Sequence, residues 1–220
     1  MIIQYVLIST IEYNQKQSSK MLINIIRTLY HLPRWVVCQF QLVRLKAKGV
    51  YFGNGIQLVG RTRWYIMGRL VIGSNFVSAS NQKHSIDTQV CSKVTVGKKG
   101  VLKIGNNVGI TNTSIQCEDR IEIGDYVIIG AGVLIMDSNF HDTSWKNRRN
   151  ADTGCNTAKT SPVIIGDDCF IGARSIICKG VKIGPRSTIA AGSVVVKDVP
   201  SDEVWGGNPA QFICKNAEFC

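Results

Sequence analysis

Histidine is the one side chain whose ordinary pKa lies near neutrality, and this chain has three, His31, His84 and His141. His141 stands out because two carboxylates, Asp137 and Asp142, lie close to it in the segment Asp137-Ser-Asn-Phe-His-Asp142. A neutral imidazole can remove a proton from a weak nucleophile such as an alcohol. We therefore take His141 as a candidate general base, with Asp137 and Asp142 as candidates to orient it.

A six-residue period indicates the scaffold that must position His141. Branched aliphatic residues recur at every sixth position: Ile165, Ile171, Ile177, Ile183, Ile189 and Val195. The residue after each is mostly small, such as Gly166 and Gly172. A helix requires apolar spacings of three and four and an ordinary strand requires alternation, so a strict six predicts a parallel β-helix. Three hexapeptides form one triangular coil, with the aliphatic residue inside and glycine easing the corner through backbone angles that other residues disfavour.

The same register appears upstream around Ile123, Ile129 and Ile135, and more weakly around Ile104 and Ile72. The solenoid is thus expected over roughly 50–200, with irregular early coils. It stops between 138 and 162, a polar stretch in which no hexapeptide can be found. A long loop without secondary structure of its own in a compact repeat domain is usually functional or disordered. His141 lies at the start of this loop.

The net charge of +11 resides in the N-terminal third of the chain. Between Glu12 and Asp87 there are eleven lysines and arginines and no acidic residue. Residues 21–46 predict an amphipathic helix interrupted at Pro33, which we expect to cap the first coil and also to allow contact with an anionic membrane surface. The apolar runs are too short to span a membrane. Nucleic acid is not expected as a partner, because no recognition motif accompanies the charge.

Composition favours one principal domain, with 45% hydrophobic residues in 220. The eight cysteines form no compact disulfide framework, and no Cys/His cluster indicates zinc. The start of the chain has no convincing signal peptide, so we expect a cytoplasmic protein, and residues 1–20 are expected to be dispensable. The predicted organisation is a basic helical segment over 1–48, a β-helix over 49–214 and a tail over 215–220.

Several motifs in this order resemble the hexapeptide-repeat acyltransferases, specifically the maltose/galactoside and polysaccharide O-acetyltransferase branch, over roughly 49–214. The motifs are Ile104-Gly-Asn-Asn-Val-Gly-Ile-Thr-Asn112, Ile123-Gly-Asp-Tyr-Val-Ile-Ile-Gly130, Asp137-Ser-Asn-Phe-His141, Pro162-Val-Ile-Ile-Gly-Asp-Asp-Cys-Phe-Ile-Gly-Ala173, Ala190-Ala-Gly-Ser-Val-Val-Val-Lys197 and Gly207-Asn-Pro-Ala210. The resemblance implies an all-β fold, a left-handed parallel β-helix. It also implies a homotrimer with active sites between subunits, acetyl-CoA as co-substrate, a saccharide acceptor and no metal.

The resemblance also assigns roles to individual residues. His141 becomes the general base, and Asn112 and Asp137 become candidates for binding the acceptor. Asn112 has another interpretation, as a corner residue whose side chain bonds its own backbone. The positions that match coenzyme contacts of the family are Phe170, Ala173, Ala191, Val196 and Lys197. The family often carries phosphate-binding arginines after Asn208-Pro209-Ala210, whereas this chain has Gln211 and Cys214 there, with Lys215 as a substitute.

The expected function is acetyl transfer from acetyl-CoA to a saccharide hydroxyl of a surface polysaccharide or its precursor, by direct transfer. An N-acetyltransferase acting on an amino sugar or a nucleotide amino sugar is the main alternative. An acyl-cysteine mechanism through Cys155 is less favoured because no histidine lies beside it in the sequence. A γ-type carbonic anhydrase needs three histidines for zinc, and here they are dispersed, while the Asp137–His141 motif argues against a non-catalytic scaffold.

Overall fold

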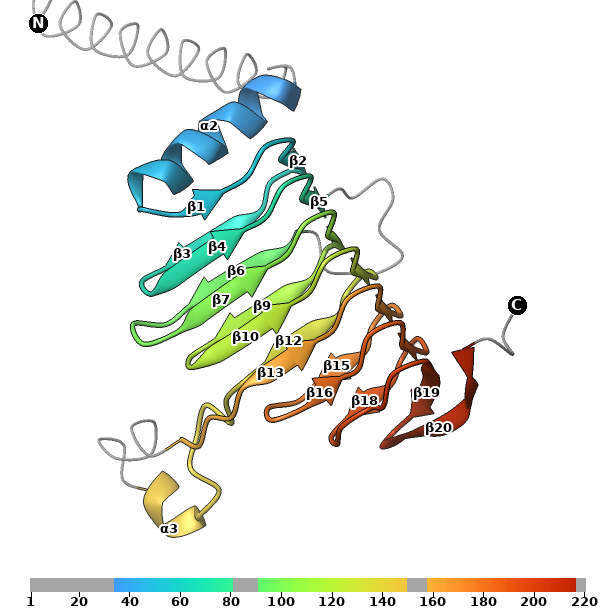
Figure 1. Cartoon of the computed structure of the whole chain (residues 1–220). Helices are drawn as coiled ribbons and strands as arrows, with labels where there is room; N and C mark the ends of the chain where they lie inside the picture. Colours follow the sequence, from blue (N-terminus) through green and yellow to red (C-terminus); the bar gives the residue numbers. More distant parts are fainter. Residues whose placement is uncertain (1–33, 81–90, 150–157, 217–220) are drawn as a thin grey trace, which may run out of the picture.

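Three parallel sheets form the walls of a triangular prism (Figure 1). The computed structural model describes residues 34–80, 91–149 and 158–216. Consecutive strands belong to different sheets, because each coil of the chain contributes one short strand to every wall. This architecture is the predicted left-handed parallel β-helix, with a helix at its N-terminal end and a long loop inserted in its side.

Each wall is named here by its first strand. The β1 wall contains β1 (Tyr51–Phe52), β4 (Arg69–Ile72), β7 (Val101–Ile104), β10 (Arg120–Ile123), β13 (Val163–Ile165) and β16 (Lys182–Ile183). The β2 wall contains β2 (Gln57–Gly60), β5 (Val77–Ser80), β8 (Gly109–Thr111), β11 (Ile128–Ile129), β14 (Phe170–Ile171), β17 (Thr188–Ile189), β19 (Glu203–Gly207) and β20 (Ala210–Lys215). The β3 wall contains β3 (Arg63–Ile66), β6 (Lys93–Val96), β9 (Ser114–Cys117), β12 (Leu134–Met136), β15 (Ile176–Ile177) and β18 (Val194–Val195).

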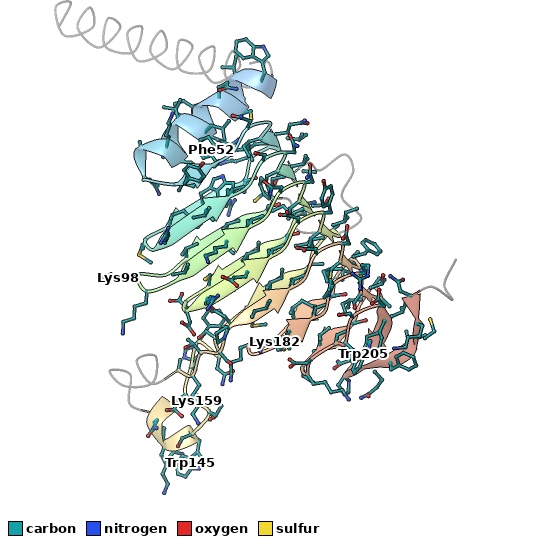
Figure 2. The ribbon with its side chains drawn as sticks, viewed as in Figure 1. Phe52, Lys98, Trp145, Lys159, Lys182 and Trp205 are labelled. Carbon is teal, nitrogen blue, oxygen red and sulfur yellow. The ribbon has the colours of Figure 1, made fainter. Side chains whose placement is uncertain are left out.

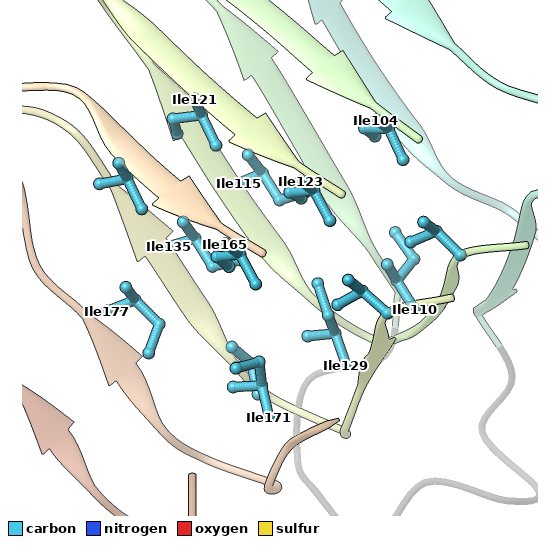
Figure 3. Packing of buried hydrophobic residues seen from close by; sticks show 14 of the residues in the cluster. Ile104, Ile110, Ile115, Ile121, Ile123, Ile129, Ile135, Ile165, Ile171 and Ile177 are labelled. Carbon is cyan, nitrogen blue, oxygen red and sulfur yellow. The ribbon is translucent and has the colours of Figure 1, made fainter. Parts of the chain in front are cut away.

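The six-residue aliphatic positions fill the prism as predicted. All six from Ile165 to Val195 are at most 2% exposed, and Figure 3 shows the isoleucines of successive coils stacked on one another. Ile165 pairs with Ile183 and Ile171 with Ile189, so one coil is eighteen residues long in this regular part. No coil can bury its own aliphatic side, and stability therefore comes from stacking.

Where glycine follows an aliphatic residue, it is required for a different reason from the one predicted. Gly166 and Gly172 do not have positive φ angles; instead, a Cβ on Gly166 would lie 2.6 Å from the backbone nitrogen of Pro185 in the next coil. The left-handed backbone occurs two residues later, at Asp168 (φ 57°) and Arg174 (φ 61°). The expectation that these glycines supply the corner angles is thus wrong, because parallel strands about 4.8 Å apart leave no room there for a side chain.

Helix α2 (Arg34–Ala47) begins directly after Pro33 and lies across the open end of the first coil (Figure 1). The helix buries Cys38 and Leu45 against the core, and the Gln41 side chain bonds the carbonyl of Gly60 at 3.1 Å. The N-terminal part of the predicted helical segment, residues 21–33, lies outside the described residues.

Close stacking of coils predicts that two glycines of similar appearance respond differently to substitution. A Cβ on Gly172 would lie 2.5 Å from the backbone nitrogen of Ala191, whereas a Cβ on Gly109 meets nothing within 4 Å. We expect Gly172→Ala to lower the free energy of unfolding by about 1–3 kcal/mol. Gly109→Ala, the matched control, should stay within about 0.5 kcal/mol of the parent. Equal losses in urea unfolding would show that contact between coils does not limit side-chain size.

Candidate active site

His141 projects from the beginning of the inserted loop and is exposed. The base of the loop is an antiparallel bridge between Ser138 and Thr160, and the backbone N–H of Asn139 donates to the carbonyl of Lys159 at 3.1 Å. Phe140 has a left-handed backbone (φ 59°), and its N–H donates to Oγ of Ser138 at 3.0 Å. These contacts fix the backbone just before His141 at the corner where the β3 wall passes into the β1 wall.

Asp137 lies beneath the loop and is completely buried. Its two carboxylate oxygens accept hydrogen bonds from the backbone N–H groups of Glu118 and Asp119, each at 2.8 Å. The carboxylate raises the pKa of neighbouring groups: burial and Asp137 raise the pKa of the Cys117 thiol to about 12 and that of Glu118 above its ordinary value. Asp137 therefore supports the turn below the loop, and its predicted part in acceptor binding stays a prediction.

Asp142 organises the outer part of the loop. Its Oδ1 accepts from the backbone N–H of Ser144 at 2.7 Å, and its Oδ2 accepts from the Asn147 side chain at 2.9 Å. The short helix α3 (Trp145–Arg148) follows and buries none of its residues. Figure 2 shows Trp145 at the far end of the loop, away from the prism, and Lys159 near its base.

Asn112 lies at a different corner, where the β2 wall passes into the β3 wall. It has a left-handed backbone (φ 42°) and is fully buried. Neither its side-chain oxygen nor its side-chain nitrogen has a hydrogen-bond partner among the described residues. Asn112 is thus a corner residue, but its side chain does not bond its own backbone as the alternative interpretation expected. A buried amide without partners is costly and calls for an explanation.

The predicted coenzyme-binding residues divide between the same two corners. Ala173 and Ala191 lie on the Asn112 side of the β3 wall, in successive coils joined by the hydrogen bond from Gly192 N–H to the Ala173 carbonyl. Val196 and Lys197 follow β18 on the His141 side. Phe170 lies on the β2 wall, 46% exposed, beside Ile128 of the preceding coil, which is 57% exposed.

The chain crosses the β3 wall between Ala131 and Asp137, which are six positions apart. At about 3.3 Å per residue this is a distance of about 20 Å. Within one chain, the structure therefore brings Asn112 near Ala173 and Ala191, and His141 near Val196 and Lys197. It does not bring these two groups together.

Lys197 belongs to a cluster that the sequence did not reveal. Its ammonium group lies 5.2 Å from the centre of the Trp205 ring and donates to the Gln211 side chain at 3.1 Å. The Trp205 indole donates to Glu203 at 2.8 Å, and Lys215 donates to the other Glu203 oxygen at 2.7 Å. The Lys215 and Trp205 hydrogen bonds hold the pKa of Glu203 below its ordinary value. The spacing of Glu203 and Trp205 was the sequence signal that could have revealed this cluster, because residues two apart in a strand lie on the same face.

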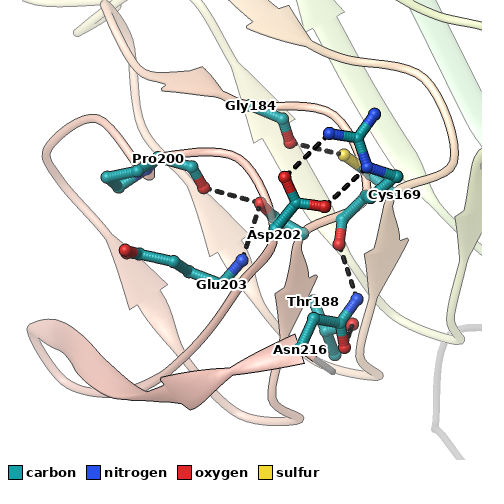
Figure 4. A network of polar contacts seen from close by, with 9 residues as sticks. Cys169, Gly184, Thr188, Pro200, Asp202, Glu203 and Asn216 are labelled. Atoms are coloured by element: carbon teal, nitrogen blue, oxygen red, sulfur yellow. Dashed lines mark hydrogen bonds and ion pairs between the residues drawn. The ribbon is translucent and has the colours of Figure 1, made fainter. Parts of the chain in front are cut away.

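Polar contacts attach the C-terminal hairpin of β19 and β20 to the last coils (Figure 4). Arg186 forms a two-pronged ion pair with Asp202, at 2.5 and 2.7 Å, and the Asn216 side chain donates to the Arg186 carbonyl. This pairing holds Asp202, just before β19, against Arg186, just before β17. Within the described ranges no group of histidine, cysteine and carboxylate side chains has the geometry of a metal site. His31, His84 and Cys155 lie outside those ranges.

Known proteins share both the repeat and the fold. Residues 162–197 match the model of the hexapeptide repeat of succinyl-transferase. The chain is 57% identical over 53 residues to a 2,3,4,5-tetrahydropyridine-2,6-dicarboxylate N-acetyltransferase of Clostridium perfringens, a match that covers 24% of this chain and only 22% of that enzyme. The curated relatives thus share about a fifth of their length with it.

Two solved structures match much more of the chain. A hexapeptide-repeat acetyltransferase from Vibrio cholerae O1 biovar eltor, complexed with acetyl-CoA, is 30% identical with a TM-score of 0.51, over 64% of this chain and 70% of that one. A mutant of AntD, an N-acyltransferase from Bacillus cereus in complex with dTDP-4-amino-4,6-dideoxyglucose and coenzyme A, has a TM-score of 0.64 at 23% identity, over 79% and 88%. The chain belongs to the hexapeptide-repeat acetyltransferases.

The Glu203 cluster predicts a defined dependence of stability on pH. A carboxyl whose pKa falls on folding stabilises the protein above its ordinary pKa of 4.5, and that stabilisation is lost as pH falls through the lowered value. We expect Glu203→Gln to lower the melting temperature at pH 7, with the difference from the parent shrinking below about pH 4.5.

Asp119→Asn is the matched control, since the Asp119 carboxylate forms no ion pair with a described residue. It should leave the melting temperature at pH 7 nearly unchanged. A Glu203→Gln difference that stays constant from pH 7 to pH 3 would contradict an ionised Glu203 as its origin.

Proposed function

We propose that this chain transfers the acetyl group of acetyl-CoA to a hydroxyl of a saccharide, a surface polysaccharide or its precursor, with His141 as general base. The imidazole takes the hydroxyl proton while the oxygen attacks the thioester carbonyl. The tetrahedral intermediate then collapses, the bond from carbon to sulfur breaks, and the imidazolium returns the proton to the departing thiolate. No acyl-enzyme is required.

The observation that carries this proposal is the position of His141 on a braced corner of the prism. The antiparallel bridge of Ser138 with Thr160 and the hydrogen bond to Ser138 Oγ restrict the backbone just before the imidazole. Val196 and Lys197 lie on the same corner two coils further along the axis, about 10 Å away at the usual strand spacing. A pantetheine arm running along this corner spans such a distance, with Lys197 available for a coenzyme phosphate.

Association into a homotrimer would bring together the two groups of site residues. Asn112, Ala173 and Ala191 lie at one edge of the β3 wall, and His141 and Lys197 lie at the other. A cyclic trimer repeats one heterologous contact, so that one edge of each copy meets the opposite edge of its neighbour. We propose that each active site combines the His141 edge of one copy with the Asn112 edge of the next, where the unpartnered Asn112 amide gains the acceptor as partner.

An amino group is the second candidate acceptor, and the comparisons favour it. The curated Clostridium enzyme is named as an N-acetyltransferase, and AntD is an N-acyltransferase crystallised with a nucleotide amino sugar. A neutral amine attacks a thioester without prior loss of a proton, whereas a hydroxyl needs a base. Loss of the base therefore affects the two acceptors to different degrees.

The N-terminal end supports a place at the inner face of a membrane. Helix α2 exposes Trp35 and Phe40 together with Arg44 and Lys46, a combination of apolar and basic groups suited to an anionic lipid surface. Among the described helices, none has the length and apolar character needed to cross a bilayer. The proposed contact is therefore peripheral.

Replacement of His141 tests the proposed chemistry. We expect His141→Ala to lower kcat for a saccharide hydroxyl by about 10²–10⁴-fold, the usual contribution of a general base. Thr143→Ala, an exposed change two residues away on the same loop, should keep parental activity. The assay measures thiol release from acetyl-CoA with paired acceptors such as glucose and glucosamine. Alkaline hydroxylamine then separates the products, because it cleaves an ester and leaves an amide intact.

Unchanged thiol release by His141→Ala on an accepted sugar would refute the general-base role. A hydroxylamine-resistant product made only from the amino sugar would replace O-acetyl transfer by N-acetyl transfer.

Mixed oligomers test whether the site is shared. Co-expression of His141→Ala with Asn112→Ala, each inactive alone, should restore about a third of the parental sites in purified mixed trimers, since a cyclic trimer of either two-to-one composition places one intact His141 edge against an intact Asn112 edge. Activity is measured after affinity purification through a different tag on each variant. No recovery in mixed trimers of confirmed composition would show that the two residues do not serve one site across a subunit boundary.

A further inference from the structure

A cavity of about 580 Å³ lies between helix α2 and strand β3, at the end of the prism remote from the C-terminal hairpin. Four cationic side chains line it. Arg44 belongs to α2 and Lys48 follows that helix, while Arg61 precedes β3 and Arg63 is its first residue. The aromatic rings of Phe40, Trp64 and Tyr65 complete much of the remaining surface. Arg61 and Thr62 lie on the same corner of the prism as Asn112, but two coils nearer the N-terminal end.

The charge in this cavity is not balanced by the protein that the structure describes. None of its lining residues is acidic, and none of the four cations forms an ion pair with a described residue. The sequence itself has no acidic residue between Glu12 and Asp87. Like charges held around one space repel each other, so an anion entering it would be bound favourably.

Trp64 lies on the opposite side of β3 from Arg63 and Tyr65. The strand alternates exposed and partly buried residues, and Trp64 packs against the hydrophobic core. Among the polar groups at the cavity, the Gln41 side chain is already used, because it donates to the Gly60 carbonyl at 3.1 Å and accepts from the Thr62 N–H at 3.2 Å. The donors left for a ligand are therefore the cations, and a multivalent oxyanion suits such a set.

The surroundings of the cavity indicate where such an anion comes from. The outward side of α2 exposes Trp35 (68%), Phe40 (62%) and Val43 (66%), and the adjoining part of the β3 wall exposes Met67 (64%). Exposed aromatic and aliphatic groups beside lysines and arginines are typical of a surface that enters the interface of a bilayer. A lipid headgroup meets both conditions, because its phosphate can enter the cavity while its acyl chains contact the apolar side of the helix.

We propose that the cavity between α2 and β3 binds the phosphate group of a membrane lipid, with Arg61 and Arg63 as its principal donors. This assignment rests on the peripheral membrane contact proposed above and is independent of acetyl transfer. It gives the basic N-terminal region a recognition site for a phosphate instead of a diffuse attraction to any negative surface. It also places the lipid at the same end of every copy in a cyclic assembly.

Vesicle binding by the full chain tests this assignment. Phosphatidylcholine vesicles carry either phosphatidic acid or a fatty acid, matched for surface charge, and binding is followed by flotation. Arg61→Gln with Arg63→Gln should weaken binding to the phosphatidic acid vesicles about thirtyfold, the effect of removing two cations near the surface. Lys98→Gln with Lys99→Gln, in the β6–β7 turn outside the cavity (Figure 2), removes the same charge and should change binding less than about threefold.

Competition separates phosphate recognition from charge. Inorganic pyrophosphate should compete with the phosphatidic acid vesicles in the parent chain and not in the Arg61→Gln, Arg63→Gln variant.

Four results would overturn the assignment. Equal losses in the two charge-matched double variants, or equal affinity of the parent for both vesicle types, would leave only general electrostatics. Pyrophosphate binding without vesicle binding would identify a soluble ligand, and no vesicle binding at all would remove the membrane contact itself. Acetyl transfer to a soluble acceptor, measured on the same preparation, shows separately whether the proposed enzyme activity holds.

Discussion

The fold depends on how closely successive coils approach each other. Parallel strands lie about 4.8 Å apart. At the corners this spacing places the residue that follows the aliphatic position against the backbone of the next coil. Gly166 and Gly172 meet backbone atoms there at distances that no Cβ can occupy. The change of direction is made elsewhere, at Asp168 and Arg174, where the backbone is left-handed. Stacking and turning are therefore carried by different positions of the hexapeptide.

The sequence predicts the repetitive part of the structure well for this reason. A six-residue period requires only that one position point inward and another be small, and both properties belong to single residues. The period therefore located the buried isoleucines and the interruption after Ile135. The explanation for glycine failed because close contact with another coil involves a residue nineteen positions away, as for Gly172 and Ala191, and a local pattern does not report that contact.

The candidate site was less predictable, because its members depend on contacts between distant segments. His141 could be found from its motif, but nothing local indicates that Asp137 has both oxygens bonded to the turn at Glu118 and Asp119. The Asn112 amide looked like an ordinary corner residue until the structure showed it buried without partners among the described residues. Outside the candidate site, the Trp64 indole nitrogen, which likewise has no partner among them, was equally hard to predict, since its surroundings depend on how α2 packs over β3.

The inserted loop shows how a rigid solenoid can carry chemistry without losing its register. Ile123 and Ile165 pair directly although they are 42 residues apart, so the chain leaves the prism after β12 and returns in β13 at the position that an uninterrupted coil would have reached. At the base of the insertion, the Asp137 carboxylate and the Ser138–Thr160 bridge provide hydrogen bonds for backbone groups where the chain leaves the regular coil. The described part of the loop beyond this base contributes no residue to the buried core. A solenoid can therefore change the residues of such a loop while the stacked coils on either side keep their register.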